Sequence, residues 1–504
     1  ANTPTALPSL KSLAKDTAVY GLSSIIGRFL NWLLVPLYTI TFAEAQYGTV
    51  SFIYAWVALT LALLIYGMET GFFRFANHDR YPDPHVVYST AMTSIACSST
   101  LFVILVMASM PWLSGAMHCP DHPEYVAMMA VTVAVDAFTS IPFSWLRYRH
   151  RPIRFATVKL IGIGMNIGLN LFFILLCPAL YRSWPDAVSA FYSPTFGIGY
   201  IFLSNLIATL VTLVILIPDF TGFRWRFDRT LWREMLSYSA PLLVLGLAGI
   251  MNQNLDKILL PALIADPAEG MRQLGIYSAN YKIAIVMVMF TQAFRFAYEP
   301  FIFAQNRTDN NDPDKYRPFR VAMLYFVIFS MVIFLGVMFY LDILRYFIGR
   351  EYFSGLKVVP IIMLAEFFFG VFFNLSLWYK LTDRTIWGTY FSLTGLAVTL
   401  LMNYLLVPSI GYMGCAWAAL TCYGVMMVLS YVTGRIKHPI GYRLGPLLTY
   451  FFLALALYGA AIVLTTGNPW IDYTLRTALL LGYIAFAARR ENCFGLRRHR
   501  VKTA

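Results

Sequence analysis

Charged residues are scarce in this sequence. They make up 12% of the 504 residues, whereas apolar residues make up 59% and the mean hydropathy is +0.64. A soluble globular domain carries roughly twice that share of charge, about 25%. The low charge therefore excludes an ordinary soluble protein. The aromatic content of 16% and the long uncharged runs indicate instead an α-helical protein that crosses a membrane many times.

Motifs for catalysis and nucleotide binding are also missing. The sequence has no glycine-rich phosphate-binding loop, no nucleophile elbow and no HExxH pair. All seven histidines fall in predicted loops, and the group of His118, Cys119 and His122 has no partner cluster that would complete a metal site. We therefore expect no enzyme, no ATP-driven pump, no cofactor and no bound metal.

Cysteines and targeting signals give little information about the fold. The six cysteines are scattered, mostly within apolar runs, so we expect buried inert thiols rather than a disulfide framework. The first apolar run, Ala18–Phe42, is much longer than the apolar region of a signal peptide, which has about 7–15 residues. It also lacks a small-residue cleavage site. We expect this run to remain as the first membrane span.

Long apolar runs, separated by charged or Pro/Gly-rich stretches, predict about fourteen transmembrane helices. Their approximate centres lie at Phe29, Leu59, Thr100, Val135, Gly168, Leu206, Gly249, Val288, Phe329, Glu366, Ala397, Ala419, Leu455 and Leu480. The expected fold class is an all-α polytopic membrane protein.

Loop cations orient these spans. The loops on one side carry basic clusters within 147–154, 224–233, 307–320, 435–443 and 489–502. The loops on the other side carry only Arg182, Arg272, Arg345, Arg350, Lys357 and Arg476. By the positive-inside rule the first side is cytoplasmic, and both termini are cytoplasmic with it. The net charge of +13 then reflects topology and attraction to anionic lipid, and no nucleic-acid partner is expected.

The chain also resembles itself. The stretch "WLRYRHRPIRFATVKLIGIGMNIGLNLFFI" from Trp145 aligns without gaps with "WYKLTDRTIWGTYFSLTGLAVTLLMNYLLV" from Trp378, which pairs Asn170 with Asn403. Spans 1–6 and 7–12 are thus two copies of a six-helix unit, and their even number makes them parallel repeats that enclose a site between two lobes. The predicted division is an N-lobe at 1–218, a C-lobe at 219–434, and two further helices with a basic tail at 435–504.

Four cations at membrane depth are candidate substrate-binding residues: Arg28, Lys282, Arg295 and Arg74. An arginine in mid-span costs about +2.5 to +3.5 kcal/mol, and such residues usually face a bundle interior or an aqueous cavity. Arg28 lies about 18 Å along its helix, near the midplane. Its planar guanidinium suits a diphosphate, which it can bind bidentately. The alternative is that Arg28 pairs with a buried acid or with backbone carbonyls.

Four further polar residues are candidates for ion coupling: Asp256, Asn403, Asp136 and Glu366. The three acids could carry a coupling cation, or they could simply neutralise buried cations. The sequence alone leaves both interpretations open.

The opening span pair, "AKDTAVYGLSSIIGRFLNWLLVPLYTITFAEAQYGTVSFIYAWVALTLALLIYGMETGFFRFA", resembles the start of bacterial polysaccharide flippases. These are the Wzx-like oligosaccharide-lipid exporters of the MOP (multidrug/oligosaccharidyl-lipid/polysaccharide) superfamily. The resemblance implies translocation of an undecaprenyl-pyrophosphate-linked oligosaccharide across the cytoplasmic membrane. Cations of spans 1 and 8 would bind the substrate, with Arg28 in span 1 and either Lys282 or Arg295 in span 8.

The same resemblance implies, for some relatives, Na⁺ coupling through an acid on span 7 with polar groups on spans 11 and 12. Asp256 and Asn403 lie on the corresponding spans 7 and 11, although span 11 has no second acid here. Expected partners are the lipid-linked oligosaccharide, membrane lipids and other polysaccharide-assembly proteins. Two alternatives remain: a multidrug or organic-cation antiporter of the same superfamily, and a membrane polysaccharide polymerase or ligase.

Overall fold

The computed structural model describes residues 21, 23, 25–224, 226–305, 316–382 and 384–491. Helices account for nearly all of them, and no strand occurs within this part of the chain. Thirteen helices are long and apolar enough to cross a membrane, which confirms the all-α polytopic class. Each contains one of the span centres from Leu59 to Leu480. The first predicted span is described as a shorter apolar helix, Ile25–Thr41.

The order of elements follows the apolar runs because a chain in lipid must satisfy its backbone polar groups internally, and a helix does so within one segment. The first part consists of α2 Val35–Thr41, α3 Glu44–Ile65, α4 Met68–Ala76, α5 Pro84–Ala108, α6 Met110–Ala116, α7 Pro123–Tyr148, α8 Pro152–Leu171, α9 Cys177–Ser183, α10 Pro185–Val188, α11 Gly199–Leu216 and α12 Arg229–Leu263. The second part consists of α13 Pro267–Gln305, α14 Arg317–Phe339, α15 Leu341–Leu344, α16 Val359–Leu375, α17 Leu377–Leu381, α18 Ile386–Ile410, α19 Tyr412–Lys437, α20 Leu444–Val463 and α21 Pro469–Arg490.

The helices separate into two compact units. Unit 1 takes Ala1–Ala279 and Ser392–Ala419, and unit 2 takes Asn280–Phe391 and Leu420–Ala504. Three long helices, α13, α18 and α19, therefore contribute to both units. Each unit is described by itself below.

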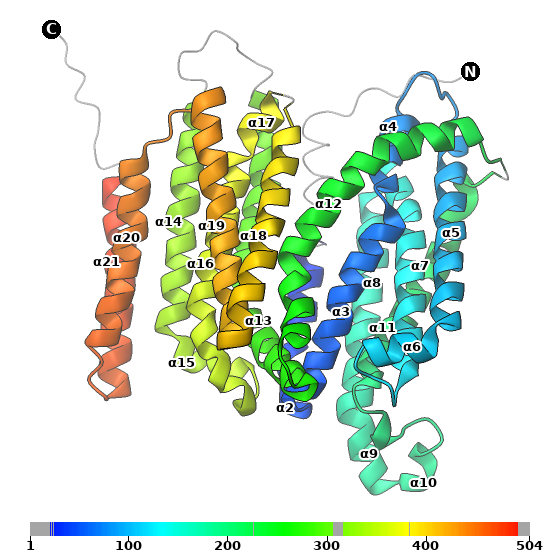
Figure 1. Ribbon diagram of the computed structural model, residues 1–504, viewed down its shortest axis with the longest axis horizontal. Helices are drawn as coiled ribbons and strands as arrows, with labels where there is room; N and C mark the ends of the chain where they lie inside the picture. Colours follow the sequence, from blue (N-terminus) through cyan, green and yellow to red (C-terminus); the bar gives the residue numbers. More distant parts are fainter. Residues whose placement is uncertain are drawn as a thin grey trace. The chain divides into compact units, whose positions relative to one another are not determined.

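In unit 1, α7 packs against α3, α5 and α11, and α8 packs against α11 (Figure 1). The long helix α12 contacts α3 and α4, and it bends along its length in Figure 1. Pro241 and Pro261 lie inside α12, where each removes a backbone hydrogen bond, and such residues are the usual cause of helix bending. The core of the unit is aromatic and aliphatic, with Phe72 and Ile141 fully buried.

In unit 2, α14 packs against α16, α20 and α21, and the last two helices pair with each other (Figure 1). Phenylalanines fill the contacts between α13, α14 and α16: the ring centroid of Phe326 lies 5.6 Å from that of Phe290 and 6.4 Å from that of Phe367. On the other side of α16, the Phe367 centroid lies 5.5 Å from that of Phe451 on α20. The predicted additional helices are thus part of the packed core of this unit.

A glycine–glycine crossing holds α3 against the first turns of α13 within unit 1. A Cβ atom added at Gly48 would lie 1.9 Å from the carbonyl oxygen of Met271, and one added at Gly275 would lie 1.8 Å from that of Glu44. Only residues without a side chain let two backbones come this close. Arg272 closes the same crossing by pairing with Glu44 at 3.0 Å and with Glu269 at 2.7 Å.

The paired asparagines of the sequence repeat adopt the same local geometry. Asn170 on α8 and Asn403 on α18 are both fully buried, and the Nδ2 of each donates to the carbonyl four residues earlier at 2.8 Å. Their Oδ1 atoms differ. That of Asn170 accepts a 2.9 Å hydrogen bond from the Tyr38 hydroxyl, whereas that of Asn403 has no hydrogen-bond partner among the described residues.

Candidate functional site

Arg28 lies on the first described helix, and its side chain is exposed. The segment around it runs along α8. A Cβ atom at Gly27 would lie 2.5 Å from Cδ1 of Ile163, and Asn166 donates to Asn31 at 3.3 Å. The helix is interrupted by a turn at Leu33 and Leu34, just before α2 begins with Pro36 in its first turn. Packing against α8 therefore fixes the helix at a position where Arg28 is exposed.

Arg74 and Asp136 are the other candidates in the early part of unit 1, and both have local partners. The Arg74 guanidinium carbon lies 4.1 Å from the centroid of the Tyr238 ring on α12, a cation–π distance. Asp136 on α7 accepts a 3.2 Å hydrogen bond from Thr209 on α11 and interacts electrostatically with Lys159 on α8. These contacts favour structural roles: Arg74 secures α4 on α12, and Asp136 compensates the charge of Lys159.

Asp256 on α12 is 7% exposed and accepts a 2.6 Å hydrogen bond from the Tyr277 hydroxyl of α13 and a 2.8 Å bond from the Lys257 backbone. One turn earlier, Asn252 donates to the carbonyl of Ser392 on α18 at 3.0 Å. Thus α12 contacts both α13 and α18, and α18 carries the candidate Asn403. Within the described part of the chain, however, no hydrogen bond joins Asp256 to Asn403.

In unit 2, α13 carries Lys282 and Arg295. Lys282 is half-buried, and Arg295 is exposed with its guanidinium carbon 4.8 Å from the centroid of the Phe373 ring. Thirteen residues of helix separate the two cations by about 20 Å along its axis. One diphosphate is too small to contact both, so they are alternatives. Glu366 on α16 is 4% exposed and accepts a hydrogen bond from the Tyr281 hydroxyl, next to Lys282 in the sequence.

The sequence did not lead us to the two tyrosines that donate hydrogen bonds to the buried acids. Tyr277 and Tyr281 are one helical turn apart on α13 and donate to Asp256 and Glu366 respectively. Their spacing of four residues places both on one face of the helix and was visible in the sequence. Among the described residues, no group of three His, Cys, Asp or Glu side chains is arranged to hold a metal ion.

Comparison with known proteins identifies the family. The sequence profile of the family described as "Polysaccharide biosynthesis protein" matches residues 13–302, more than half of the chain. The chain belongs to the polysaccharide biosynthesis protein family. No curated protein gives a significant match in sequence.

Solved structures show which fold this member of the polysaccharide biosynthesis family has. The lipid II flippase MurJ, in an inward closed conformation, matches with a TM-score of 0.70 at 12% identity, over 94% of this chain and 99% of MurJ. An inward-facing MATE multidrug resistance transporter of the MOP superfamily matches with a TM-score of 0.62 at 13% identity, over 84% and 94% of the two chains. An outward-facing MATE transporter gives 0.56 at 14% identity, over 86% and 98%. The chain shares its fold with these three structures.

Proposed function

We propose that this protein is a flippase that moves an undecaprenyl-pyrophosphate-linked oligosaccharide across the bacterial cytoplasmic membrane, for cell-surface polysaccharide biosynthesis. Membership of the polysaccharide biosynthesis family and a fold shared with a lipid II flippase over 94% of the chain support this function. In the proposed mechanism the protein alternates between inward-open and outward-open states around a cationic cavity. It transports and does not polymerise or ligate sugars.

The observation that carries the proposal is the exposed position of Arg28 on an apolar helix. An arginine at this depth is expensive in lipid, so its side chain is expected at an aqueous or ligand-filled space. Its two parallel N–H groups fit the oxygens of a diphosphate. In this proposal Arg28 binds the diphosphate, while the undecaprenyl tail stays in the bilayer.

The second cation comes from α13. Lys282 and Arg295 are about 20 Å apart along the helix, so the proposal assigns the diphosphate to one of them. Arg74 is a weaker candidate for binding the diphosphate because its guanidinium stacks on Tyr238. The membrane potential then favours outward movement of the anion by about 2.3 kcal/mol per charge per 100 mV, which can drive flipping without a coupling ion.

If an ion is coupled, Asp256 is the best of the candidate residues. It is buried, its carboxylate is held by Tyr277, and Asn403 offers a buried oxygen on α18. Asp136 accepts a hydrogen bond from the Thr209 hydroxyl and interacts electrostatically with Lys159, and Glu366 accepts a hydrogen bond from the Tyr281 hydroxyl. The proposal keeps both termini cytoplasmic, the lobe division at 218 and 434, and other polysaccharide-assembly proteins as partners.

The test is translocation of a fluorescent undecaprenyl-pyrophosphate oligosaccharide in proteoliposomes containing the purified full chain. We expect Arg28→Ala to slow flipping at least about tenfold, since a charge-assisted hydrogen bond contributes about 1.5–3 kcal/mol. Arg28→Lys should retain part of the rate. Arg182→Ala, which removes one exposed charge at the end of the apolar helix Pro152–Ser183, is the matched control and should flip at the wild-type rate.

Two outcomes would contradict the proposal. One is an unchanged rate for Arg28→Ala in a protein with wild-type thermal stability. The other is efflux of a fluorescent organic cation without any flipping of the lipid-linked sugar, which would favour the antiporter alternative. Of the two separate variants Lys282→Ala and Arg295→Ala, one should flip the substrate more slowly and the other should flip it at close to the wild-type rate.

A further inference from the structure

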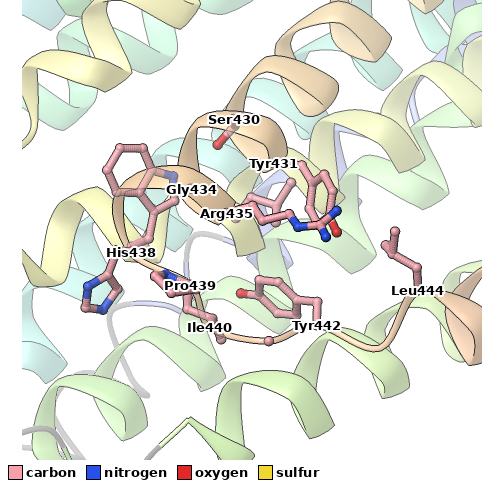
Figure 2. A pocket seen from close by; sticks show the side chains of 12 residues that line it. Ser430, Tyr431, Gly434, Arg435, His438, Pro439, Ile440, Tyr442 and Leu444 are labelled. Atoms are coloured by element: carbon pink, nitrogen blue, oxygen red, sulfur yellow. The ribbon is translucent and has the colours of Figure 1, made fainter.

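A cavity of about 410 Å³ lies at the end of unit 2 where α19 finishes, on the side predicted to be cytoplasmic (Figure 2). We call it the Trp378 pocket. Its walls are the last turns of α19, the segment from His438 to Tyr442 that follows them, the first residue of α20, and Leu375 and Trp378 beside α17. None of the residues assigned above to substrate or ion binding lines it.

The lining of the Trp378 pocket is basic. Arg435 and His438 contribute to it, and no aspartate or glutamate is among its described lining residues. Tyr442 also borders a second cavity of about 430 Å³, which adds Arg317, Arg320 and Arg443. The one carboxylate among the residues lining that second cavity, Glu491, accepts a 2.7 Å hydrogen bond from Tyr450. The region as a whole favours an anion.

Two buried polar groups of the lining need a hydrogen-bond partner. Ser430 and Trp378 are 0% and 1% exposed, yet the Ser430 hydroxyl and the Trp378 indole nitrogen make no hydrogen bond in the described structure. The indole N–H can only donate, so it requires an acceptor. Gly434 keeps the ring in this position, because a Cβ atom there would lie 2.9 Å from Cδ1 of Trp378. A ligand rich in acceptor oxygens would satisfy both groups.

The equivalent tryptophan of the other predicted repeat lines a pocket that contains an acid. In unit 1, Trp145 packs on Gly222 in a cavity of about 260 Å³, the Trp145 pocket. Its lining includes Asp219, which is 8% exposed and pairs with Arg154 at 3.1 Å. The ring of His85 is bonded to the Gly222 carbonyl at 2.8 Å. The Trp145 pocket therefore supplies its own anion, and the Trp378 pocket does not.

Apolar residues at the mouth of the Trp378 pocket indicate the source of the anion. Leu444 lines the pocket and is 40% exposed, and Leu448, one turn further along α20, is 47% exposed. Exposed leucines on a membrane helix face acyl chains. We propose that the Trp378 pocket binds the phosphate headgroup of an anionic phospholipid, with its acyl chains along α20. Basic pockets between transmembrane helices on the cytoplasmic side are suited to such headgroups.

In this site the guanidinium of Arg435 binds two phosphate oxygens, and the Trp378 N–H and Ser430 hydroxyl donate to the phosphate. His438 adds a further polar contact at the pocket wall, where its Nε2 already lies 2.8 Å from the Tyr316 hydroxyl. The bound lipid would join the end of α19 to the start of α20.

The test uses native mass spectrometry of the purified full chain, titrated with phosphatidylglycerol or with phosphatidylcholine. We expect phosphatidylglycerol to bind the wild type more tightly than phosphatidylcholine. Arg435→Gln should weaken phosphatidylglycerol binding about tenfold or more, because it removes a charge-assisted bidentate contact. Arg149→Gln, the matched change in the Trp145 pocket, should leave it unchanged. Trp378→Phe keeps the ring and removes the N–H, so it should weaken binding by a smaller factor.

Thermal unfolding in lipid-free detergent shows whether each variant is folded, and Ser430→Ala replaces Trp378→Phe if that protein is unstable. Equal phosphatidylglycerol binding by wild type and Arg435→Gln would overturn the proposal, as would equal binding of the two lipids. A third arm adds inorganic phosphate. If it displaces phosphatidylglycerol at equimolar concentration, the pocket binds a free phosphate and the assignment to a lipid is wrong. Each outcome is independent of Arg28 and of the flipping assay.

Discussion

The Trp145 and Trp378 pockets each pack an indole against a glycine, and they differ in that only the first has an acid among its described lining residues. In each, an indole packs on a glycine whose Cβ atom would lie less than 3 Å from the ring. The lining of the first pocket includes Asp219, which pairs with Arg154, beside Arg149 and Arg151, whereas the lining of the second has Arg435 and no acid among its described residues. The two pockets thus share the indole–glycine packing and differ in their polar groups. A buried polar group that has a partner in one pocket, where the corresponding group in the other pocket has none, is therefore a guide to function.

The largest expected effect concerns the crossing of α3 and α13. Gly48 on α3 and Gly275 on α13 lie where the two backbones touch. We expect Gly275→Leu to destabilise the protein by at least about 3 kcal/mol, since the added atoms would meet backbone that has no room to move. Thermal unfolding in detergent measures the effect.

The control for this change is Gly164→Leu on α8, where a Cβ atom would meet nothing within 4 Å. Its unfolding temperature should stay near that of the wild type. If the two leucine variants unfold at the same temperature, the crossing contributes nothing special to stability.

An intermediate loss of stability is expected when the acid that distinguishes the Trp145 pocket is removed. Asp219→Asn leaves the half-buried Arg154 without its charged partner, although Arg154 keeps a 2.6 Å bond to the Ile215 carbonyl. The expected cost is about 1–2 kcal/mol of stability. The same variant should gain phosphatidylglycerol binding at the Trp145 pocket, which native mass spectrometry detects as an additional adduct.

Asp83→Asn is a suitable comparison, because Asp83 also pairs with an arginine, Arg224 at 2.8 Å, but at an exposed position. Exposed pairs contribute about 0–1 kcal/mol, so this variant should lose less stability than Asp219→Asn and gain no lipid. Identical behaviour of the two variants would remove the electrostatic contrast between the pockets.

The smallest expected effect is a difference in stability between variants of the paired asparagines. Asn170→Leu leaves the Tyr38 hydroxyl without its acceptor and should cost about 1–2 kcal/mol. Asn403→Leu removes an oxygen that has no partner, so its stability should lie within about 0.5 kcal/mol of the wild type. A stable Asn403→Leu protein that has lost ion-dependent flipping would support coupling at Asn403. Equal destabilisation by both changes would show that the two asparagines contribute equally to the stability of the protein.

The sequence by itself determined the class of fold and the positions of the spans. Apolar runs of bilayer length permit little besides helices, because unpaired backbone groups are too costly in lipid. All thirteen predicted spans from Leu59 onward match apolar helices, and the family resemblance carried by Ala14–Ala76 agrees with the profile match over 13–302. The sequence also singled out Arg28, since a cation in an apolar run is visible without any structure.

Only the tertiary structure decided what the buried polar residues contact. Nothing in the order of residues joins Tyr277 to Asp256 or Tyr281 to Glu366, because these pairs meet through the packing of separate helices. The same is true of the Trp378 pocket, whose lining comes from two stretches of the chain, residues 375–378 and 430–444. Hydropathy fixes where each helix begins and ends, but the rotation of a helix about its axis, and hence the partner of each polar side chain, is set by close packing against its neighbours.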